Sequence, residues 1–256
     1  MNHRATAMNK QTLLFDMDDT LIYCNKYFDA VLDQFNDLMT TWFKAFRVSA
    51  KDIKKVQNEY DIAGVEKNGF VSTHFPKSLV HTFKYFSDLT GRTLTKVEED
   101  QLWKLGMSVY EMEVEPYPGM METLNQLRDA GHELFLYTGG EAVIQQRKID
   151  QMKLEQYFGD RIFIRQHKSI DALEGILQQL KLDRTNTWMI GNSLRTDVLP
   201  ALTNGIHAIY LKQRTEWSFN IVDLDVKPQG AFYTVEKLTE VPSKIHNWVT
   251  DARAHV

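Results

Sequence analysis

The sequence lacks the features of a membrane-spanning, secreted or nucleic-acid-binding protein. Cys24 is the only cysteine among the 256 residues, which excludes an intrachain disulfide and a cysteine-based metal site. The longest uninterrupted apolar run is four residues, too short to cross a bilayer, and the opening residues 1–4 lack the apolar stretch of a signal peptide. The 30 Lys and Arg against 34 Asp and Glu give a net charge of -4, which leaves no basic excess to hold a polyphosphate backbone. We therefore expect a cytoplasmic protein without a nucleic-acid or membrane partner.

What the sequence does have is the alternation of an α/β protein. Apolar residues make up 43% and charged residues 25%, which is an ordinary globular composition. Short apolar runs alternate with helix-length segments, the pattern of a parallel sheet covered by helices. The candidate strands are Thr12–Phe15, His132–Tyr137, Arg161–Ile164, Thr187–Ile190 and Ala208–Leu211. The candidate helices around the later strands are Gly119–Ala130, a helix that Ser169 caps and that runs through Leu180, and Asp197–Asn204.

The interval between the first two candidate strands breaks this alternation. More than a hundred residues separate Phe15 from His132, far beyond a normal crossover connection. Apolar residues recur at three- and four-residue steps from Phe28 to Phe46, which indicates one face of a helix. We predict two parts, an α/β core formed by residues 1–24 and 113–256 and a helical insert formed by residues 25–112.

Further helix starts lie within this insert. Ser49 can cap a second helix, and Thr95 with Glu98 has the spacing of a capping box that opens a third. The aromatic stripe between Phe28 and Phe46 could be a ligand surface or an interhelical core, and the pattern alone favours the core.

A cluster of acidic residues follows the first candidate strand. Asp16 and Asp18 come directly after the apolar run that ends at Phe15, and Asp19 and Thr20 follow them. Open α/β sheets place their ligands at the carboxyl ends of strands, and a spacing of two puts Asp16 and Asp18 on one side of an extended backbone. Carboxylates this close repel each other, a nearby cation would relieve the repulsion, and hard oxygen ligands favour Mg²⁺. The alternative is an acidic turn in which Asp19 caps a helix.

At this point the sequence resembles the haloacid dehalogenase superfamily. The first motif of that family is an apolar strand followed by D-x-D-x-T, which Asp16, Asp18 and Thr20 match. The other three motifs follow in order, in segment 134–140, at Lys168 and in segment 191–197. The resemblance covers roughly residues 12–211 and implies a doubly wound parallel sheet with a helical cap inserted after the first strand. The insert itself matches only in position and in its helical pattern.

The resemblance also implies a role for each motif residue. Asp16 would attack phosphorus and form an aspartyl-phosphate, and Asp18 would protonate the leaving alkoxide and then accept a proton from the attacking water. Thr138, with backbone N–H groups around Gly139, would bind a phosphoryl oxygen, although a threonine that ends a strand can also be satisfied by backbone. Lys168 would neutralise charge shared by the phosphate and Asp16.

The fourth motif contains a departure from the family. The family has G-D-S-x-x-x-D, whereas this chain has Asn192 where the family has a metal-binding aspartate. The implied Mg²⁺ site therefore consists of Asp16, the backbone carbonyl of Asp18, Asn192, and Asp197 either directly or through a water. Metal-independent dehalogenases of the superfamily also have an asparagine near this motif, but they lack the acidic residue at the position of Asp18.

These residues favour a Mg²⁺-dependent phosphatase that acts on a small phosphorylated metabolite. A phosphomutase would use the same residues, a 2-haloacid dehalogenase would need no acid for an alkoxide, and a non-catalytic binding protein could keep the fold while losing metal affinity at Asn192. The sequence does not indicate which oligomeric state the protein has, nor what role the polar segment 212–230 has.

Overall fold

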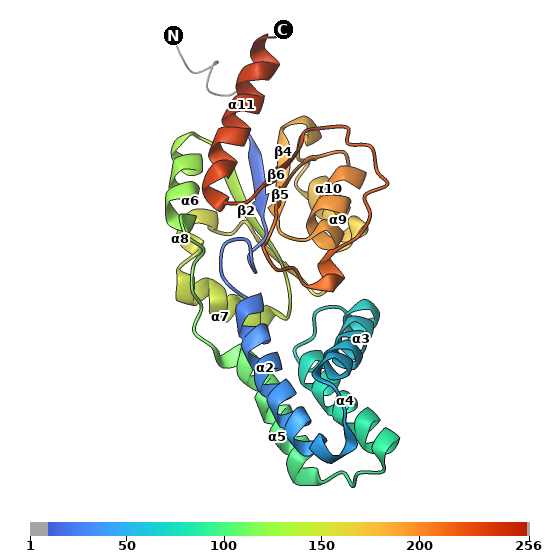
Figure 1. Cartoon of the computed structure of the whole chain (residues 1–256). Helices are drawn as coiled ribbons and strands as arrows, with labels where there is room; N and C mark the ends of the chain where they lie inside the picture. Colours follow the sequence, from blue (N-terminus) through green and yellow to red (C-terminus); the bar gives the residue numbers. More distant parts are fainter. Residues whose placement is uncertain (1–9, 255–256) are drawn as a thin grey trace. The chain divides into compact units, whose positions relative to one another are not determined.

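The structure, a computed structural model, describes residues 10–254 and forms two compact units (Figure 1). The α/β unit consists of residues 10–23 and 114–254, and the helical unit is Cys24–Glu113. Residues 1–9 and 255–256, which include the opening segment 1–4, lie outside the described part. None of the described helices combines the length and the apolar character needed to cross a membrane.

The α/β unit is built on a six-stranded sheet with the order β3-β2-β1-β4-β5-β6, in which every neighbouring pair is parallel. The strands are β1 (Thr12–Phe15), β2 (Glu133–Gly139), β3 (Ile162–Arg165), β4 (Thr187–Gly191), β5 (His207–Leu211) and β6 (Phe232–Val235). After β3 the chain returns to the other side of β1 to add β4. This reversal is the topological switch point at which such sheets bind ligands. The sheet confirms the predicted doubly wound α/β fold.

Helices cover both faces of this sheet (Figure 1). The helices are α6 (Met120–Asp129), α7 (Ala142–Met152), α8 (Glu155–Phe158), α9 (Ile170–Gln179), α10 (Leu199–Thr203) and α11 (Val241–Ala254). Successive strand side chains alternate between faces, so Leu13 packs in the core under α6 and α11, and Leu14 packs in the core under α9 and α10. Short helical turns are η3 (Arg184–Asn186), η4 (Leu194–Val198), η5 (Ser218–Asn220) and η6 (Leu238–Glu240).

Two helix boundaries in the α/β unit bear on the site. Ser169 caps α9 as predicted, because its hydroxyl accepts a hydrogen bond from the Ala172 N–H over 3.1 Å. The helix predicted from Asp197 to Asn204 differs from the observed one. The chain makes a wide π-type turn at η4 before α10 begins, since the N–H groups of both Asp197 and Val198 donate to the Ser193 carbonyl.

The helical unit contains four main helices, which pack on a core of their own. They are α2 (Asn25–Trp42), α3 (Ala50–Asn68), α4 (His74–Thr90) and α5 (Lys96–Ser108), with the short turns η1 (Lys44–Phe46) and η2 (Val109–Glu111). Phe35, Met39 and Phe43 of the aromatic stripe are fully buried in this core, whereas Phe46 is exposed. The stripe is therefore an interhelical core over most of its length.

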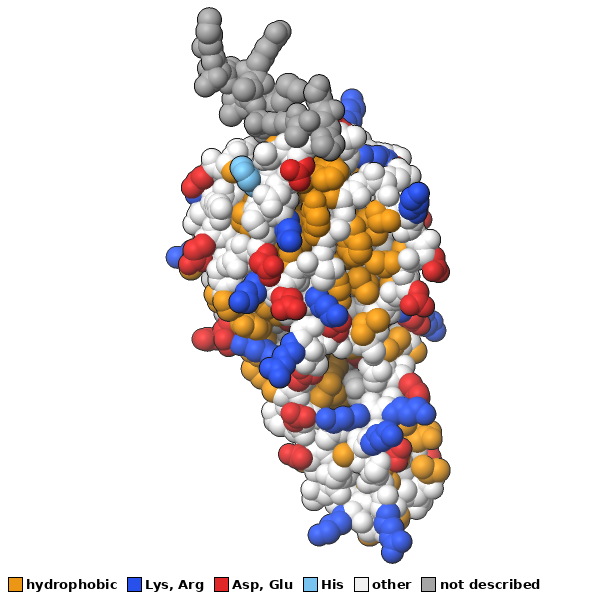
Figure 2. All heavy atoms as spheres, turned by 45° about the horizontal axis from the view of Figure 1, so that its top comes forward, with side chains coloured by type: hydrophobic (Ala, Val, Ile, Leu, Met, Phe, Trp, Pro, Cys, Tyr) orange, Lys and Arg blue, Asp and Glu red, His pale blue; other side chains and the backbone are white. Residues whose placement is uncertain are grey.

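The predicted helix starts in this unit are confirmed. Ser49 caps α3 by accepting from the Asp52 N–H, and Thr95 and Glu98 form a reciprocal capping box at the start of α5. On the face of the molecule in Figure 2, acidic and basic side chains are interspersed rather than gathered by sign.

Candidate active site

Asp16 stands at the carboxyl end of the central strand. Its N–H donates to the Ile190 carbonyl over 2.9 Å and thereby continues the β1–β4 pairing one residue beyond the strand. Its carboxylate is almost fully buried: Oδ1 accepts from Lys168 Nζ over 2.7 Å, and Oδ2 accepts from Thr20 Oγ1 over 3.0 Å. The first motif therefore places a carboxylate with two fixed donors at the switch point of the sheet.

The turn after Asp16 is tight and has one backbone position with positive φ. The N–H groups of Leu21 and Ile22 both donate to the Met17 carbonyl, and Asp19 has a φ of 57°. The capping role considered for Asp19 is wrong, because the next helix begins only at Asn25. Asp19 instead forms the left-handed corner that turns the chain back toward the sheet.

A buried ion triad joins the first, third and fourth motifs. Lys168 lies just before α9, is 5% exposed, and its Nζ contacts Oδ1 of both Asp16 and Asp197. The same ammonium lies 4.9 Å from the centre of the Tyr137 ring. Two carboxylates face one ammonium, so the triad has an excess negative charge.

Asp197 is held by the unusual turn in which it lies. Its Oδ2 accepts from the Ser193 N–H over 3.0 Å, and its other oxygen contacts Lys168. A Cβ on Gly191 would collide with this carboxylate, so the glycine that ends β4 leaves the space for it. Because both oxygens have protein donors, Asp197 serves first as the partner of Lys168.

Burial and the neighbouring charges shift the pKa values of Asp16 and Lys168. Burial raises the pKa of Asp16 to about 7, with the Lys168 ammonium acting in the opposite direction and the Asp197 carboxylate adding to the rise. Burial acts to lower the pKa of Lys168, but the carboxylates of Asp16 and Asp197 outweigh it and raise that pKa. The triad is thus a place where an added cation would stabilise the ionised form of Asp16.

The oxygen atoms near Asp16 are of the chemical type that binds Mg²⁺. Thr20 Oγ1 lies 3.0 Å from Asp16 Oδ2 and 3.5 Å from Asn192 Oδ1, so both of these oxygens lie around one hydroxyl. Within the described residues, no group of three or more His, Cys, Asp or Glu side chains could hold a metal ion. A cation here would therefore depend on Asn192 and the Asp18 carbonyl in addition to Asp16. These are hard oxygen donors of the kind that Mg²⁺ prefers.

Asp18 lies beside the second motif and is held by helix α7. Lys148 Nζ contacts its two carboxylate oxygens over 2.8 and 2.9 Å, and Gln145 Nε2 donates to Oδ2 over 2.9 Å. The same Gln145 nitrogen lies 2.7 Å from the hydroxyl of the fully buried Thr138 and 2.9 Å from the Gly139 carbonyl. The structure therefore brings together the side chains that were singled out in the first and second motifs.

The glycines after Thr138 suggest backbone N–H groups that could bind an anion, but one of these N–H groups is already used. The Gly140 N–H donates to the Arg165 carbonyl over 3.0 Å and so belongs to the pairing with β3. The side-chain hydroxyl of Thr138 is linked to Asp18 through the nitrogen of Gln145.

Sequence reasoning missed Gln145, Lys148 and the function of segment 212–230. Gln213, in that segment, donates from Nε2 to the Asp19 carbonyl over 2.9 Å and accepts at Oε1 from the Tyr117 hydroxyl over 2.9 Å. The segment after β5 thus stabilises the turn that follows Asp16, through the hydrogen bond from Gln213 to Asp19. The spacing of three between Gln145 and Lys148, on the helix directly after the second motif, is the only local pattern that could have indicated them.

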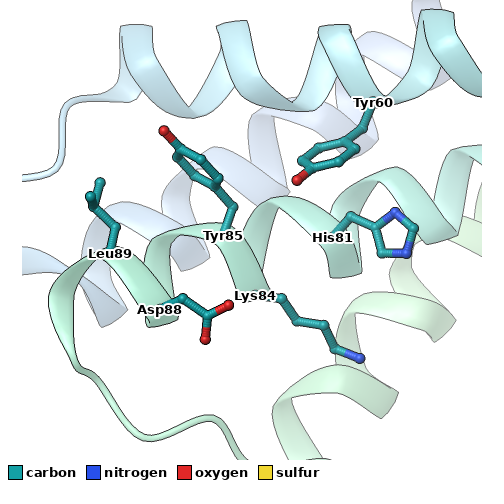
Figure 3. A pocket seen from close by; sticks show the side chains of 6 residues that line it. All are labelled: Tyr60, His81, Lys84, Tyr85, Asp88 and Leu89. Carbon is teal, nitrogen blue, oxygen red and sulfur yellow. The ribbon is translucent and has the colours of Figure 1, made fainter.

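The helical unit has a hollow of its own, between α3 and α4 (Figure 3). It is lined by Tyr60, His81, Lys84, Tyr85, Asp88 and Leu89. Lys84 is paired with Glu99 over 3.2 Å, and the ring of Tyr60 packs edge-on against His81. These are surface contacts of the unit, and no buried charge is found among them. The acidic edge of the α/β unit is the stronger candidate for an active site.

The chain resembles proteins of one family along most of its length. No curated protein matches the chain. A haloacid dehalogenase-like hydrolase from Xanthomonas campestris is 21% identical with a TM-score of 0.75, over 97% of this chain and 95% of the other. L-2-haloacid dehalogenase from Xanthobacter autotrophicus is 14% identical with a TM-score of 0.60, over 93% of this chain and 98% of the other. A HAD phosphatase from Thermococcus onnurineus is 19% identical with a TM-score of 0.52, over 92% of this chain and 97% of the other.

At these identities the solved structures show a shared fold, and they include both dehalogenases and a phosphatase. The sequence model of the family described as "haloacid dehalogenase-like hydrolase" matches residues 10–205, which contain all four motifs. The chain therefore belongs to the haloacid dehalogenase-like hydrolase family.

Proposed function

We propose that this hydrolase is a Mg²⁺-dependent phosphatase that acts on a small phosphorylated metabolite through an aspartyl-phosphate. The observation that supports this reaction best is Asp18, a second carboxylate held in place at the same edge of the sheet as Asp16. Displacing a halide from carbon needs no acid, because halide leaves as an anion. Displacing an alkoxide from phosphorus does need one.

The first half-reaction uses the two carboxylates in turn. A carboxylate oxygen of Asp16 attacks phosphorus and forms a new P–O bond, while the bond between phosphorus and the ester oxygen breaks. That ester oxygen takes a proton from the Asp18 carboxyl group and leaves as an alcohol. Lys168, 2.7 Å from Asp16 Oδ1, offsets the negative charge that the phosphoryl group brings.

The second half-reaction returns the enzyme to its starting state. A water attacks phosphorus and gives a proton to the Asp18 carboxylate, and the bond between phosphorus and Asp16 breaks. Inorganic phosphate leaves and Asp16 is again a carboxylate. Mg²⁺, held by Asp16, the Asp18 carbonyl and Asn192, would supply positive charge toward the phosphoryl oxygens, and Asp197 would act on it indirectly through Lys168.

We assign the choice of substrate to the helical unit as a cap domain. Its insertion directly after the first motif supports this assignment, as does the aromatic core that lets it fold as a compact unit. The expected partner is a small phosphorylated metabolite, and the expected location is the cytoplasm.

A dehalogenase is the second candidate, because Asn192 replaces the acidic metal ligand of the family's phosphatases. One assay separates the two. Purified protein is incubated with an aryl phosphate, a panel of sugar, nucleotide and acid phosphates, and 2-chloropropionate, each with Mg²⁺ or with EDTA, and released phosphate and chloride are measured. We expect phosphate release that requires Mg²⁺. Chloride release that EDTA leaves unchanged, without phosphate release, would establish the dehalogenase instead.

The same assay tests two further alternatives. A phosphomutase would convert a sugar monophosphate into its isomer and would depend on a bisphosphate primer, whereas a phosphatase needs none. A binding protein would release neither product with any substrate, yet would still bind phosphate esters in calorimetry.

A further inference from the structure

Helix α7 directs two side chains at the candidate active site. Gln145 and Lys148 are three residues apart, so they lie on the same face of the helix. Gln145 is 1% exposed and Lys148 has 13% of its side chain exposed, so both polar ends are largely withdrawn from water. Burying an amide and an ammonium is costly unless both are fully paired. Their partners therefore indicate why they are there.

The contacts of Gln145 determine which way its amide group points. Its nitrogen lies 2.9 Å from the Gly139 carbonyl oxygen, which only accepts hydrogen bonds, and 2.9 Å from Asp18 Oδ2, which accepts them while Asp18 is a carboxylate. The group facing them must therefore be the NH₂ group. The third neighbour, the Thr138 hydroxyl at 2.7 Å, consequently accepts a hydrogen bond from the same nitrogen. The two hydrogens are shared among three acceptors.

This orientation has a consequence for Thr138. A hydroxyl has one hydrogen to donate, and Gln145 occupies an acceptor position of its oxygen. The hydrogen of Thr138 is thereby left to donate to another acceptor. A phosphoryl oxygen is such an acceptor, so Gln145 sets the polarity that binding of an anion needs.

The backbone makes room for this arrangement. Gly140 has a φ of 144°, and a Cβ at that position would lie 2.8 Å from Gln145 Cγ and 2.9 Å from its Cδ. Any other residue would strain the chain and displace the amide group. The second glycine of the motif thus serves Gln145 rather than the anion.

Lys148 acts on the other end of the same network. It contacts both oxygens of Asp18, at 2.8 and 2.9 Å, which fixes the plane of the carboxyl group. Without that contact, Asp18 would add a third poorly compensated carboxylate to a region that already contains Asp16 and Asp197. The contact also keeps Asp18 beside Gln145, and therefore beside Thr138.

We propose that Gln145 and Lys148 are positioning residues for phosphoryl transfer: Gln145 turns the Thr138 hydroxyl into a donor for the phosphoryl group, and Lys148 holds Asp18 where the leaving oxygen is protonated. This inference rests on the proposed phosphatase function. It adds two residues outside the four motifs, and it divides the work between them, with binding of the phosphoryl group assigned to Gln145 and proton transfer to Lys148.

The division can be tested with variants that keep side-chain length. Gln145→Met removes the amide, Lys148→Met removes the charge, and Lys148→Arg retains two donors for the carboxylate. Gln146→Met is the matched control, because Gln146 lies on the same helix and its nitrogen bonds Asp150 over 2.8 Å at the surface. Steady-state kinetics with an alkyl phosphate and an aryl phosphate, inhibition by inorganic phosphate, and thermal unfolding are measured for each variant.

We expect different kinetic changes for the two positions. Gln145→Met should raise KM and the inhibition constant of inorganic phosphate by about tenfold or more, the range for a lost hydrogen bond to a charged group. Lys148→Met should lower kcat for the alkyl phosphate by about tenfold more than for the aryl phosphate, whose leaving group needs no proton. Lys148→Arg should recover most of the loss, and Gln146→Met should resemble the wild type.

Each outcome has one meaning. If the wild type releases phosphate but Gln145→Met and Lys148→Met match Gln146→Met, the positioning roles are wrong and the phosphatase assignment stands. The positioning roles are also wrong if the two variants lose kcat equally on both substrates and Lys148→Arg gives no recovery, because that result shows a structural role alone. If the wild type releases no phosphate from any ester, the proposed function has failed and this inference fails with it.

Discussion

The two units satisfy their buried polar groups in different ways. In the helical unit such groups bond within one helix or to the neighbouring helix: the Thr82 hydroxyl donates to the Ser78 carbonyl over 2.7 Å, and Gln57 Nε2 donates to the Ser78 hydroxyl, 21 residues away, over 2.9 Å. In the α/β unit the corresponding bonds join distant segments, and Lys168 contacts Asp16 across 152 residues of sequence. The partners also differ in charge: amides, hydroxyls and carbonyls in the first case, ammonium and carboxylate groups in the second.

This difference distinguishes structure from function. A bond from a side chain to the carbonyl one turn back satisfies a group that would otherwise be buried without a partner. A buried ion triad is different, because apolar residues of the same size would often be at least as stable. Charged, long-range contacts at the edge of a sheet are therefore the feature that the fold alone does not require.

The largest effect is expected at the nucleophile. Asp16→Asn should lower kcat by at least about 10⁴-fold, because a neutral amide cannot form the acyl-phosphate. Phosphate release measures the loss, and circular dichroism establishes that the variant is folded. Activity within tenfold of the wild type would show that Asp16 is not the nucleophile. The charged buried contacts of the α/β unit would then not mark an active site.

The next effect concerns stability. Lys168→Met leaves Asp16 and Asp197 buried without their cation and should lower the free energy of unfolding by about 3–5 kcal/mol at pH 7.5. Lys84→Met is the matched change in the helical unit, where the ion pair with Glu99 is largely exposed on the lysine side, and should cost less than about 1 kcal/mol. Urea denaturation in EDTA measures both. Equal losses of unfolding free energy would mean that the buried and the exposed ion pair contribute equally to stability.

Asp61 tests whether the helical unit, like the α/β unit, buries a charged group. It lies in α3, and burial alone raises its pKa to about 7. Its carboxylate form is thus disfavoured in the folded state, so stability is lost as pH rises from about 4 through 7. Asp61→Asn should be more stable than the wild type by about 1–3 kcal/mol at pH 8 and equal to it near pH 4. A variant less stable than the wild type at pH 8 would show that Asp61 has a favourable charged partner.

Asn192 gives a smaller and more specific prediction. Asn192→Asp adds a charged oxygen of the same side-chain length beside Asp16, so the Mg²⁺ concentration for half-activation should fall by about tenfold. Calorimetric titration with Mg²⁺ gives a measure that does not depend on turnover. Identical Mg²⁺ binding in the two proteins would show that Asn192 lies outside the metal site.

The smallest effect is expected at His207, which tests whether a long-range bond must be functional. Its Nδ1 accepts from the Ala231 N–H over 2.8 Å, and its Nε2 lies 2.8 Å from the Thr185 carbonyl, so the neutral ring bridges two segments at the strand start. Burial lowers the pKa of His207. Its contribution to stability is therefore complete above the ordinary pKa near 6.5 and is lost as pH falls below it.

His207→Gln keeps a donor and an acceptor but does not titrate. It should be slightly less stable than the wild type at pH 7.5, and the difference should narrow at pH 5.5, with unchanged kcat at both values. A change in kcat would show that long-range contacts far from the carboxyl ends of the strands also affect the reaction.

Most of the sheet could be predicted from sequence because its central strands are continuous apolar runs. β1 was predicted with its observed bounds, and the runs at β4 and β5 were found to within a residue. β6 was missed, since it follows a long irregular segment and only Val235 at its end is fully buried. Low burial is not the whole reason, because β3 at the opposite edge is no more buried and was predicted, so the long irregular segment before β6 is the main obstacle.

The candidate site could be predicted only as a set of residues. The order of the motifs indicates Asp16, Lys168 and Asp197, but no spacing shows that one ammonium bridges the two carboxylates. Likewise, the contact between Asp18 and Lys148 joins residues 130 positions apart. Local patterns carry no information about such pairs, because side-chain geometry and the packing of α7 determine them.

The place of β1 in the sheet has a consequence for synthesis of the chain. β1 lies between β2 and β4, and the contacts that flank it reach residues 121 and 175 positions later in the sequence. At about 5–20 residues per second, a ribosome needs roughly 6–24 s to produce the first of these partners. During that time the helical unit can fold, since its internal contacts lie within Cys24–Glu113. The apolar strand β1 still lacks both of its partner strands. Of the strands in the sheet, β1 is therefore made first and is exposed longest on the nascent chain, although three of its four residues are buried in the folded protein.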